Sequence, residues 1–131
     1  MNILIFGLPG SGKTTFAKEL CKDLDVAYFN GDQVRTMFND WRFDSRSRGT
    51  QAYRMQKLCS IANKNCVVDF ICPYDKFRNH YNITVWINTI KEGRFENTNK
   101  IFEKPTKADF EIVDYNYEKI IKQLKEIINE K

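Results

Sequence analysis

One stretch decides the fold of this 131-residue chain: Gly7-Leu8-Pro9-Gly10-Ser11-Gly12-Lys13-Thr14. It reads G-x-x-x-x-G-K-T and directly follows Asn2–Phe6, an apolar run that predicts a buried strand. The glycines let the backbone curl so that its N–H groups surround a phosphate chain, and the helix that begins here adds partial positive charge. Lys13 is then expected to reach the β and γ phosphates, and the Thr14 hydroxyl to ligate Mg²⁺. A plain glycine-rich turn is the alternative, but the complete motif in this context favours an ATP site over residues 7–15, with Thr15 as its last member.

Outside this loop, short apolar runs alternate with longer amphipathic stretches. The runs predict strands at Val26–Asn30, Cys66–Ile71, Ile83–Ile87 and, at the edge, Phe110–Val113. The amphipathic stretches predict helices at Thr14–Leu24, Gln33–Phe38, Thr50–Ala62, Asp75–His80 and from about Asn116 onwards. Asp40–Gly49 is polar and Arg-rich and is expected to be a loop, whereas Glu92–Lys104 has no assignable pattern. This alternation predicts a three-layer α/β domain with a mostly parallel sheet over residues 1–131. The phosphate-loop motif indicates that the fold is of the P-loop NTPase and kinase type.

The composition is typical of a soluble globular domain. Hydrophobic residues make up 42% and charged residues 29%, which excludes disorder as the main state. No apolar stretch is long enough to span a membrane, Met1–Phe6 is too short for a signal peptide, and the four cysteines form no C-x-x-C pair. The net charge of +4 suits anionic ligands but is not a dense basic patch. We therefore expect a cytoplasmic protein with reduced cysteines, no membrane partner, and either a monomeric or a homodimeric state.

An aspartate and an arginine stand at the end of the second predicted strand, in the segment Asn30-Gly31-Asp32-Gln33-Val34-Arg35. Ligands of open α/β sheets bind beyond the carboxyl ends of the strands, which is where this segment is expected to lie. Asp32 is suited to orient or deprotonate an acceptor hydroxyl, and Arg35 to hold an acidic group. The alternative is that Asp32 only caps the next helix and Arg35 lies on the surface.

A second acid ends the predicted strand Val67-Val68-Asp69-Phe70-Ile71, which is followed by Cys72-Pro73-Tyr74. Asp69 is a candidate carboxylate for holding Mg²⁺ through water, next to the phosphate loop. An ordinary strand-end aspartate remains an equal alternative.

Taken together, these segments resemble the adenylylsulfate kinase family, which phosphorylates the 3′-hydroxyl of adenosine 5′-phosphosulfate. The matching stretches are Gly7–Thr15, Asn30–Arg35, Phe43 through Arg48 to Arg54, Phe70–Tyr74 with Arg78, and Phe102-Glu103-Lys104-Pro105. The resemblance implies that Asp32 contacts the 3′-hydroxyl. It also implies that the adenylylsulfate pocket includes Arg35, Phe43, Arg48, Gln51 and Ile71. Gln51 stands where the family has Asn, and Asn30 where it has the first Asp of D-G-D.

The family's mobile lid is shortened in this chain. Only Asn88–Ile101 separates Ile87 from Phe102, and the family's K-G-L-Y stretch is absent. Arg94 and Lys100 are the candidates to supply the positive charges of the lid, which places Arg94 among the expected catalytic residues. A reduced lid is expected to exclude water less well and to relax the choice of acceptor.

Three other functions remain open. A polynucleotide 5′-hydroxyl kinase combines a similar loop with an Asp–Arg segment, and a series of arginines with Phe43 and Tyr53 could hold a nucleic-acid strand. This partner is less favoured than a small nucleotide. A non-catalytic nucleotide-binding module is disfavoured by Asp32, because a binder needs no acid near an acceptor. A small-metabolite kinase of gluconate or shikimate type is the third alternative.

Overall fold

The computed structural model describes residues 1–130, which form five strands and six helices. The strands are β1 (Asn2–Phe6), β2 (Ala27–Asn30), β3 (Cys66–Asp69), β4 (Ile83–Ile87) and β5 (Phe110–Ile112). The helices are α1 (Lys13–Cys21), α2 (Gly31–Phe38), α3 (Ser45–Ala62), α4 (Asp75–Arg78), α5 (Glu96–Ile101) and α6 (Glu118–Asn129). Among these residues, no helix has the length and apolar character needed to cross a membrane.

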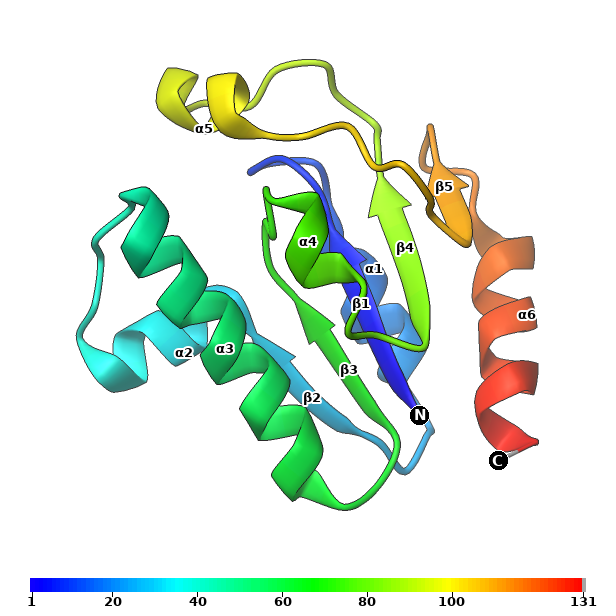
Figure 1. Ribbon diagram of the computed structural model, residues 1–131. Helices are drawn as coiled ribbons and strands as arrows, with labels where there is room; N and C mark the ends of the chain where they lie inside the picture. Colours follow the sequence, from blue (N-terminus) through cyan, green and yellow to red (C-terminus); the bar gives the residue numbers. More distant parts are fainter. Residues whose placement is uncertain (131) are drawn as a thin grey trace.

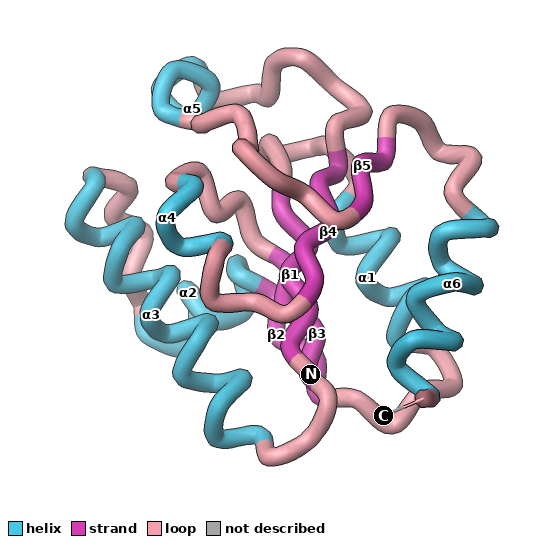
Figure 2. The backbone as a smooth tube through the Cα atoms, turned by 45° about the vertical axis from the view of Figure 1, so that its right-hand side comes forward, coloured by secondary structure: helices cyan, strands magenta, loops and turns pink. Residues whose placement is uncertain are grey.

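The strands form one sheet in the order β2-β3-β1-β4-β5, and all four pairings are parallel. In Figure 2 the sheet is seen edge-on, with α1 and α6 on one side and α2, α3 and α4 on the other. The carboxyl ends of the strands point towards the top of Figure 1, where α5 lies on the side of α3 and α4, while the N-terminus lies at the opposite end. The predicted three-layer α/β architecture with a mostly parallel sheet is therefore confirmed.

Each face of the sheet has its own apolar core. Ile3 and Ile5 of β1 pack with Phe16 and Leu20 of α1 and with Leu124 of α6. The alternate residues of β1 belong to the opposite core, whose members include Leu4, Phe6, Val34, Met55 and Val68. Because successive side chains of a strand point to opposite faces, an unbroken apolar run is what a sheet covered on both sides requires.

Several predicted bounds differ from the observed ones by a few residues, and two of the differences concern the cavity side of the sheet. Residues 45–49, expected to be loop, are the first turns of α3, because the Asp44 side chain accepts a hydrogen bond from the Ser47 N–H and caps the helix there. The segment from Phe70 to Ile71, expected to extend the third strand, lies beyond the end of β3, although the Phe70 N–H still donates to the Ile5 carbonyl oxygen at 3.2 Å. A turn follows at Cys72, whose φ of 45° ends the extended conformation. The unassigned stretch Glu92–Lys104 contains α5.

Candidate functional site

The phosphate loop links β1 to α1 at the carboxyl edge of the sheet (Figure 1). Gly7 cannot be replaced without a clash, because a Cβ there would lie 2.5 Å from the carbonyl oxygen of Ile87 on β4. Gly12 is the N-cap of α1 with φ 99°, a conformation that favours glycine. These two positions explain why the loop can curl over the start of a helix.

The polar groups of this loop fit an anionic ligand. The Lys13 ammonium donates to the carbonyl oxygen of Leu8 at 3.0 Å, inside the loop itself. The Ser11 hydroxyl is buried and has no hydrogen-bond partner among residues 1–130. Pro9, Gly10 and Thr15 line the adjoining pocket, and a Cβ on Gly10 would meet nothing within 4 Å. The Lys13 side chain lines this open space, and donors in such a place are what a polyphosphate requires.

Burial lowers the pKa of Lys13 from 10.5 to about 8. The desolvation of the ammonium outweighs the opposing attraction of Asp69 and Asp32. A bound polyphosphate would raise the pKa of Lys13 again, because it attracts the ammonium.

The residues expected to hold Mg²⁺ lie next to each other. The Thr14 hydroxyl donates to Asp69 Oδ1 at 3.4 Å, from the start of α1 to the end of β3. Asp69 is 1% exposed, and burial raises the pKa of its carboxyl group. A hydroxyl and a carboxylate beside a phosphate loop fit Mg²⁺, which keeps several waters and takes few protein oxygens.

Two further side chains contact the Asp69 carboxylate. The Asn30 amide lies within 3.2 Å of both of its oxygens, and the Tyr28 hydroxyl donates to Oδ2. The parallel register explains the meeting, because Asn30 pairs with Asp69 across β2 and β3. Sequence reasoning missed Tyr28 altogether. The signal that could have found it is the two-residue spacing that puts Tyr28 on the same strand face as Asn30.

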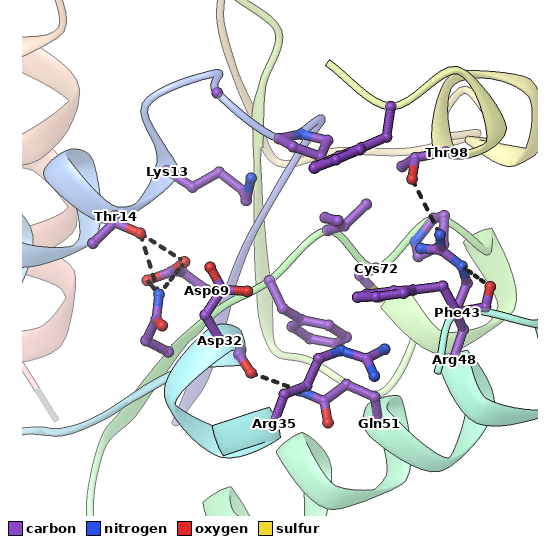
Figure 3. A pocket seen from close by; sticks show the side chains of 18 of the residues that line it. Lys13, Thr14, Asp32, Arg35, Phe43, Arg48, Gln51, Asp69, Cys72 and Thr98 are labelled. Atoms are coloured by element: carbon purple, nitrogen blue, oxygen red, sulfur yellow. Dashed lines mark hydrogen bonds between the residues drawn. The ribbon is translucent and has the colours of Figure 1, made fainter. Parts of the chain in front are cut away.

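The alternative role of Asp32 as a helix cap is not what the structure shows. Asn30 is the N-cap of α2, and its side-chain oxygen accepts from the Gln33 N–H at 3.1 Å. Asp32 is exposed in the first turn and lines the pocket, so its carboxylate is available to a ligand (Figure 3).

One cavity of about 830 Å³ joins the donor and acceptor sides (Figure 3). Its polar lining includes Lys13, Asp32, Arg35, Arg48, Asp69 and Arg94. Its apolar lining includes Trp41, Phe43, Phe70, Ile71, Phe77 and Phe95. All the expected acceptor residues therefore face the same space as the phosphate loop.

Arg35 is partly engaged by the segment between α2 and α3. One of its Nη atoms donates to the carbonyl oxygens of Asp40 and Arg42, at 3.0 and 2.9 Å. Its guanidinium also lies 4.5 Å from the ring centre of Phe43. Burial lowers the pKa of Arg35, but a guanidinium remains charged at neutral pH. Contrary to the surface alternative, Arg35 is buried.

Asp40 organises this same segment, a role that sequence reasoning missed. Its carboxylate pairs with Arg42 at 2.9 Å and with Arg54 of α3 at 2.9 Å. Hydrogen bonds, chiefly from Arg42, hold the pKa of Asp40 well below its ordinary value. Residues 40–43 are thus fixed to α3 and α2 and present Phe43 to the cavity.

Arg48 and Gln51 project from α3 into the cavity, and both are buried (Figure 3). Arg48 Nε donates to the carbonyl oxygen of Phe43 at 2.7 Å, and its Nη2 donates to Thr98 Oγ1 at 3.1 Å. The Gln51 amide donates to the carbonyl oxygen of Gly31 at 2.9 Å. Gln51 therefore joins α3 to the start of α2, while Arg48 joins α3 to α5.

The segment Asn88–Ile101, expected to act as a shortened lid, contributes Arg94 and Thr98 to the lining of the cavity. Arg94 is exposed, lines the cavity, and forms no ion pair among residues 1–130. Lys100 pairs with Glu96 on α5 at 3.5 Å and is not among the lining residues. The structure thus brings Arg94, but not Lys100, to the site.

Arg78 is a buried arginine for which the sequence suggested no role. Its guanidinium carbon lies 4.3 Å from the ring centre of Phe6 and 4.9 Å from that of Phe102. It donates to the carbonyl oxygens of Cys72 and Pro73 and pairs with Asp75. Arg78 therefore fixes the turn after β3 and the residue that ends the lid.

Comparison with known proteins gives one family match. A family described as AAA domain matches residues 3–72, more than half of the chain and including the phosphate loop, Asp32 and Asp69. No curated protein matches the chain in sequence.

Solved structures share the fold at low sequence identity. The APS kinase of Mycobacterium tuberculosis, in complex with AMPPNP and APS, has a TM-score of 0.73 and 18% identity over 98% of this chain and 95% of that chain. Shikimate kinase from Aquifex aeolicus has a TM-score of 0.68 and 16% identity, covering 99% and 97% of the two chains. A gluconokinase from Sinorhizobium meliloti has a TM-score of 0.65 and 13% identity, covering 98% and 94%. These similarities show a P-loop kinase fold and no particular acceptor.

Proposed function

The chain belongs to the AAA domain family. We propose that it is a phosphotransferase that moves the γ-phosphoryl group of ATP to the 3′-hydroxyl of adenylylsulfate. The observation that carries the proposal is the single cavity that the phosphate loop shares with Asp32, Arg35, Phe43 and Arg48. An acid near an acceptor position distinguishes a kinase from a nucleotide-binding module.

On the donor side, Lys13 and the N–H groups of the loop bind the β and γ phosphates and stabilise the charge that shifts towards ADP. Thr14 and Asp69 would hold Mg²⁺, which neutralises phosphate charge when bound. The Asn30 amide keeps the Asp69 carboxylate aimed at Thr14.

On the acceptor side, Asp32 accepts the proton of the attacking hydroxyl. A bond forms between that oxygen and the γ-phosphorus, the bond from the γ-phosphorus to the bridging oxygen breaks, and ADP leaves. Arg94 supplies a cation over the transferring group from the lid.

The acceptor is inferred from the chemistry of its half of the cavity. Phe43 offers an aromatic face to a base, and the two guanidiniums beside it match a phosphosulfate. Sugar acids such as shikimate and gluconate would leave this aromatic surface unused. We therefore favour a nucleotide acceptor over them.

A polynucleotide 5′-hydroxyl acceptor is the second candidate, because α3 carries four basic residues and no acidic residue. Two of these, Arg46 and Lys57, are exposed together with Tyr53 on one side of the helix. This surface could continue a strand beyond the cavity.

The test is a titration of the ADP-loaded protein with adenylylsulfate, AMP, a 5′-hydroxyl oligonucleotide, shikimate and gluconate. Turnover of labelled ATP is followed with each compound. We expect adenylylsulfate to bind best and AMP to compete poorly, because AMP lacks the sulfate. If the oligonucleotide binds best, with a steep salt dependence that Arg48→Ala reduces, the polynucleotide function replaces this one.

A further inference from the structure

Thr98 joins the lid to the acceptor side of the cavity through a buried hydrogen bond. It lies on α5, is 3% exposed, and accepts from Arg48 Nη2 at 3.1 Å (Figure 3). Fifty residues of sequence separate the two partners. Nothing in the sequence pattern of the lid pointed to this threonine.

The helix that carries Thr98 cannot hold its position alone. α5 has six residues, and its N-cap, Phe95, forms no side-chain capping hydrogen bond. Helices this short are unstable unless tertiary contacts fix them. The place of α5 over the cavity therefore depends on the contacts that it makes with the rest of the chain.

Those contacts reach both halves of the cavity. Just before α5, the Gly93 N–H donates to Asn99 Oδ1, and Asn99 Nδ2 donates to the Gly93 carbonyl oxygen. Gly93 lies against the phosphate loop so closely that a Cβ would be 3.0 Å from the Pro9 carbonyl oxygen. In the middle of the lid, Thr98 meets Arg48.

The same hydrogen bond restricts the orientation of Arg48. Its Nε is held by the Phe43 carbonyl oxygen and its Nη2 by Thr98. The Arg48 Nη1 forms no hydrogen bond within residues 1–130 and is the guanidinium nitrogen available to a ligand. A planar guanidinium fixed at two corners presents the third in a set direction.

We propose that Thr98 is a positioning residue for the acceptor: it aims the Arg48 guanidinium and thereby couples closure of the lid to occupancy of the acceptor site. The inference rests on the proposed function in one respect, that Arg48 binds an anionic group of the acceptor. Its structural half, that Thr98 fastens the lid to α3, stands on the contacts above. It also gives the shortened lid a means of acting on the acceptor without the missing K-G-L-Y stretch.

The test compares Thr98→Val, which removes the hydroxyl at nearly constant volume, with Thr98→Ser, which retains it. Adenylylsulfate is titrated into ADP-loaded protein, and ADP is titrated into free protein. Thr98→Val should weaken adenylylsulfate binding about tenfold, the scale of one hydrogen bond to a charged group, and should change ADP affinity by less than about twofold. Thr98→Ser should restore most of the loss.

The matched control is Thr84→Val. Thr84 is also buried, and its hydroxyl bonds to Asp109 between β4 and the segment before β5, away from the cavity. This variant loses the same chemical group and should retain adenylylsulfate affinity. Equal losses of adenylylsulfate and ADP affinity in Thr98→Val would show a general loss of structure and would overturn the proposal.

Hydrogen exchange separates this proposal from the proposed function. The amides of α5 in the free protein should exchange faster in Thr98→Val than in the wild type or in Thr98→Ser. If the wild type does not bind adenylylsulfate, the proposed function fails, and this measurement alone decides whether Thr98 fastens the lid. Unchanged protection of α5 overturns the inference whatever the acceptor is.

Discussion

The Asn30 side-chain amide donates towards both carboxylate oxygens of Asp69, at 3.1 and 3.2 Å. The neutral Asn30 thus faces the buried Asp69 at a position where the adenylylsulfate kinase family, which this chain resembles, has an aspartate. The Asp69 carboxylate is thereby satisfied by the chain itself. Asn30 also caps α2 through its side-chain oxygen, so one amide holds both the Asp69 carboxylate and the start of α2.

Asn30→Asp should therefore make the fold depend more strongly on Mg²⁺. The variant retains a capping oxygen but removes the donors to Asp69 and places a like charge beside it. We expect the free energy of unfolding in metal-free buffer to fall by about 1–3 kcal/mol. Magnesium should recover more stability in the variant than in the wild type, as measured by urea unfolding. Asn116→Asp, an exposed change of the same kind, is the control; equal stability of the two variants would contradict the prediction.

Nucleotide affinity should fall with rising pH through about 8, where burial places the pKa of Lys13. Bound phosphates favour the charged ammonium, so each binding event above this pH must also take up a proton. ADP affinity should drop about tenfold between roughly pH 7 and pH 9, as measured by calorimetry. In Lys13→Ala the affinity should be weak and independent of pH over the same range. A flat wild-type profile would mean that Lys13 keeps its ordinary pKa.

The stability of the nucleotide-free protein should change in the opposite direction with pH. The pKa of Lys13 in the folded chain lies below its ordinary value of 10.5, so between about pH 8 and 10.5 the unfolded chain holds a proton that the folded chain has lost. The free energy of unfolding should therefore rise with pH across this window. Urea unfolding at several pH values checks the rise, which Lys13→Ala should remove.

Asp32→Asn should separate acceptor chemistry from nucleotide binding. The change keeps the size of the side chain and removes its negative charge. ATP affinity should stay within about twofold, while phosphoryl transfer falls roughly 10²-fold or more. The exposed Asp25→Asn, outside the cavity, should retain the wild-type rate. A collapse of ATP binding in Asp32→Asn would instead place Asp32 at the metal.

Two glycines should respond to alanine in opposite ways. At Gly31 a Cβ would lie 2.6 Å from the Phe70 Cβ, so Gly31→Ala forces the start of α2 away from the chain after β3. We expect a loss of about 1–3 kcal/mol in the free energy of unfolding. Gly49 is inside α3 with its nearest contact at 3.5 Å, so Gly49→Ala should gain about 0.5–1 kcal/mol. Thermal and urea unfolding of both variants decide the matter.

The sequence predicted those elements whose pattern is local. β1 and β4 have the expected bounds, because a buried parallel strand is a continuous apolar run. The first turns of α3 lack such a pattern, since Ser45–Gly49 is polar and Arg-rich and depends on the Asp44 cap. α5 was not predictable for a related reason: its position comes from contacts such as Thr98 with Arg48, far away in the sequence.

The candidate site divides in the same way. The phosphate loop is one contiguous stretch, so its residues and their spacing could be recognised directly. The contact of Asn30 with Asp69 depends on the pairing of β2 with β3. The residues of the two strands do not by themselves show which strands are neighbours in the sheet. Asp40, Arg78 and Tyr28 act through partners from other elements, so their roles could not be assigned from the sequence around them. The roles assigned to Asp32, Arg35 and Arg94 stay predictions.

The ion pairs of Asp40 with Arg42 and Arg54 make residues 40–43 a structural unit of their own. Its shape is set by α2 and α3, while the phosphate loop belongs to β1 and α1. If the proposed function holds, substitutions in residues 40–43 and in the arginines that contact them would change the choice of acceptor while ATP binding is retained.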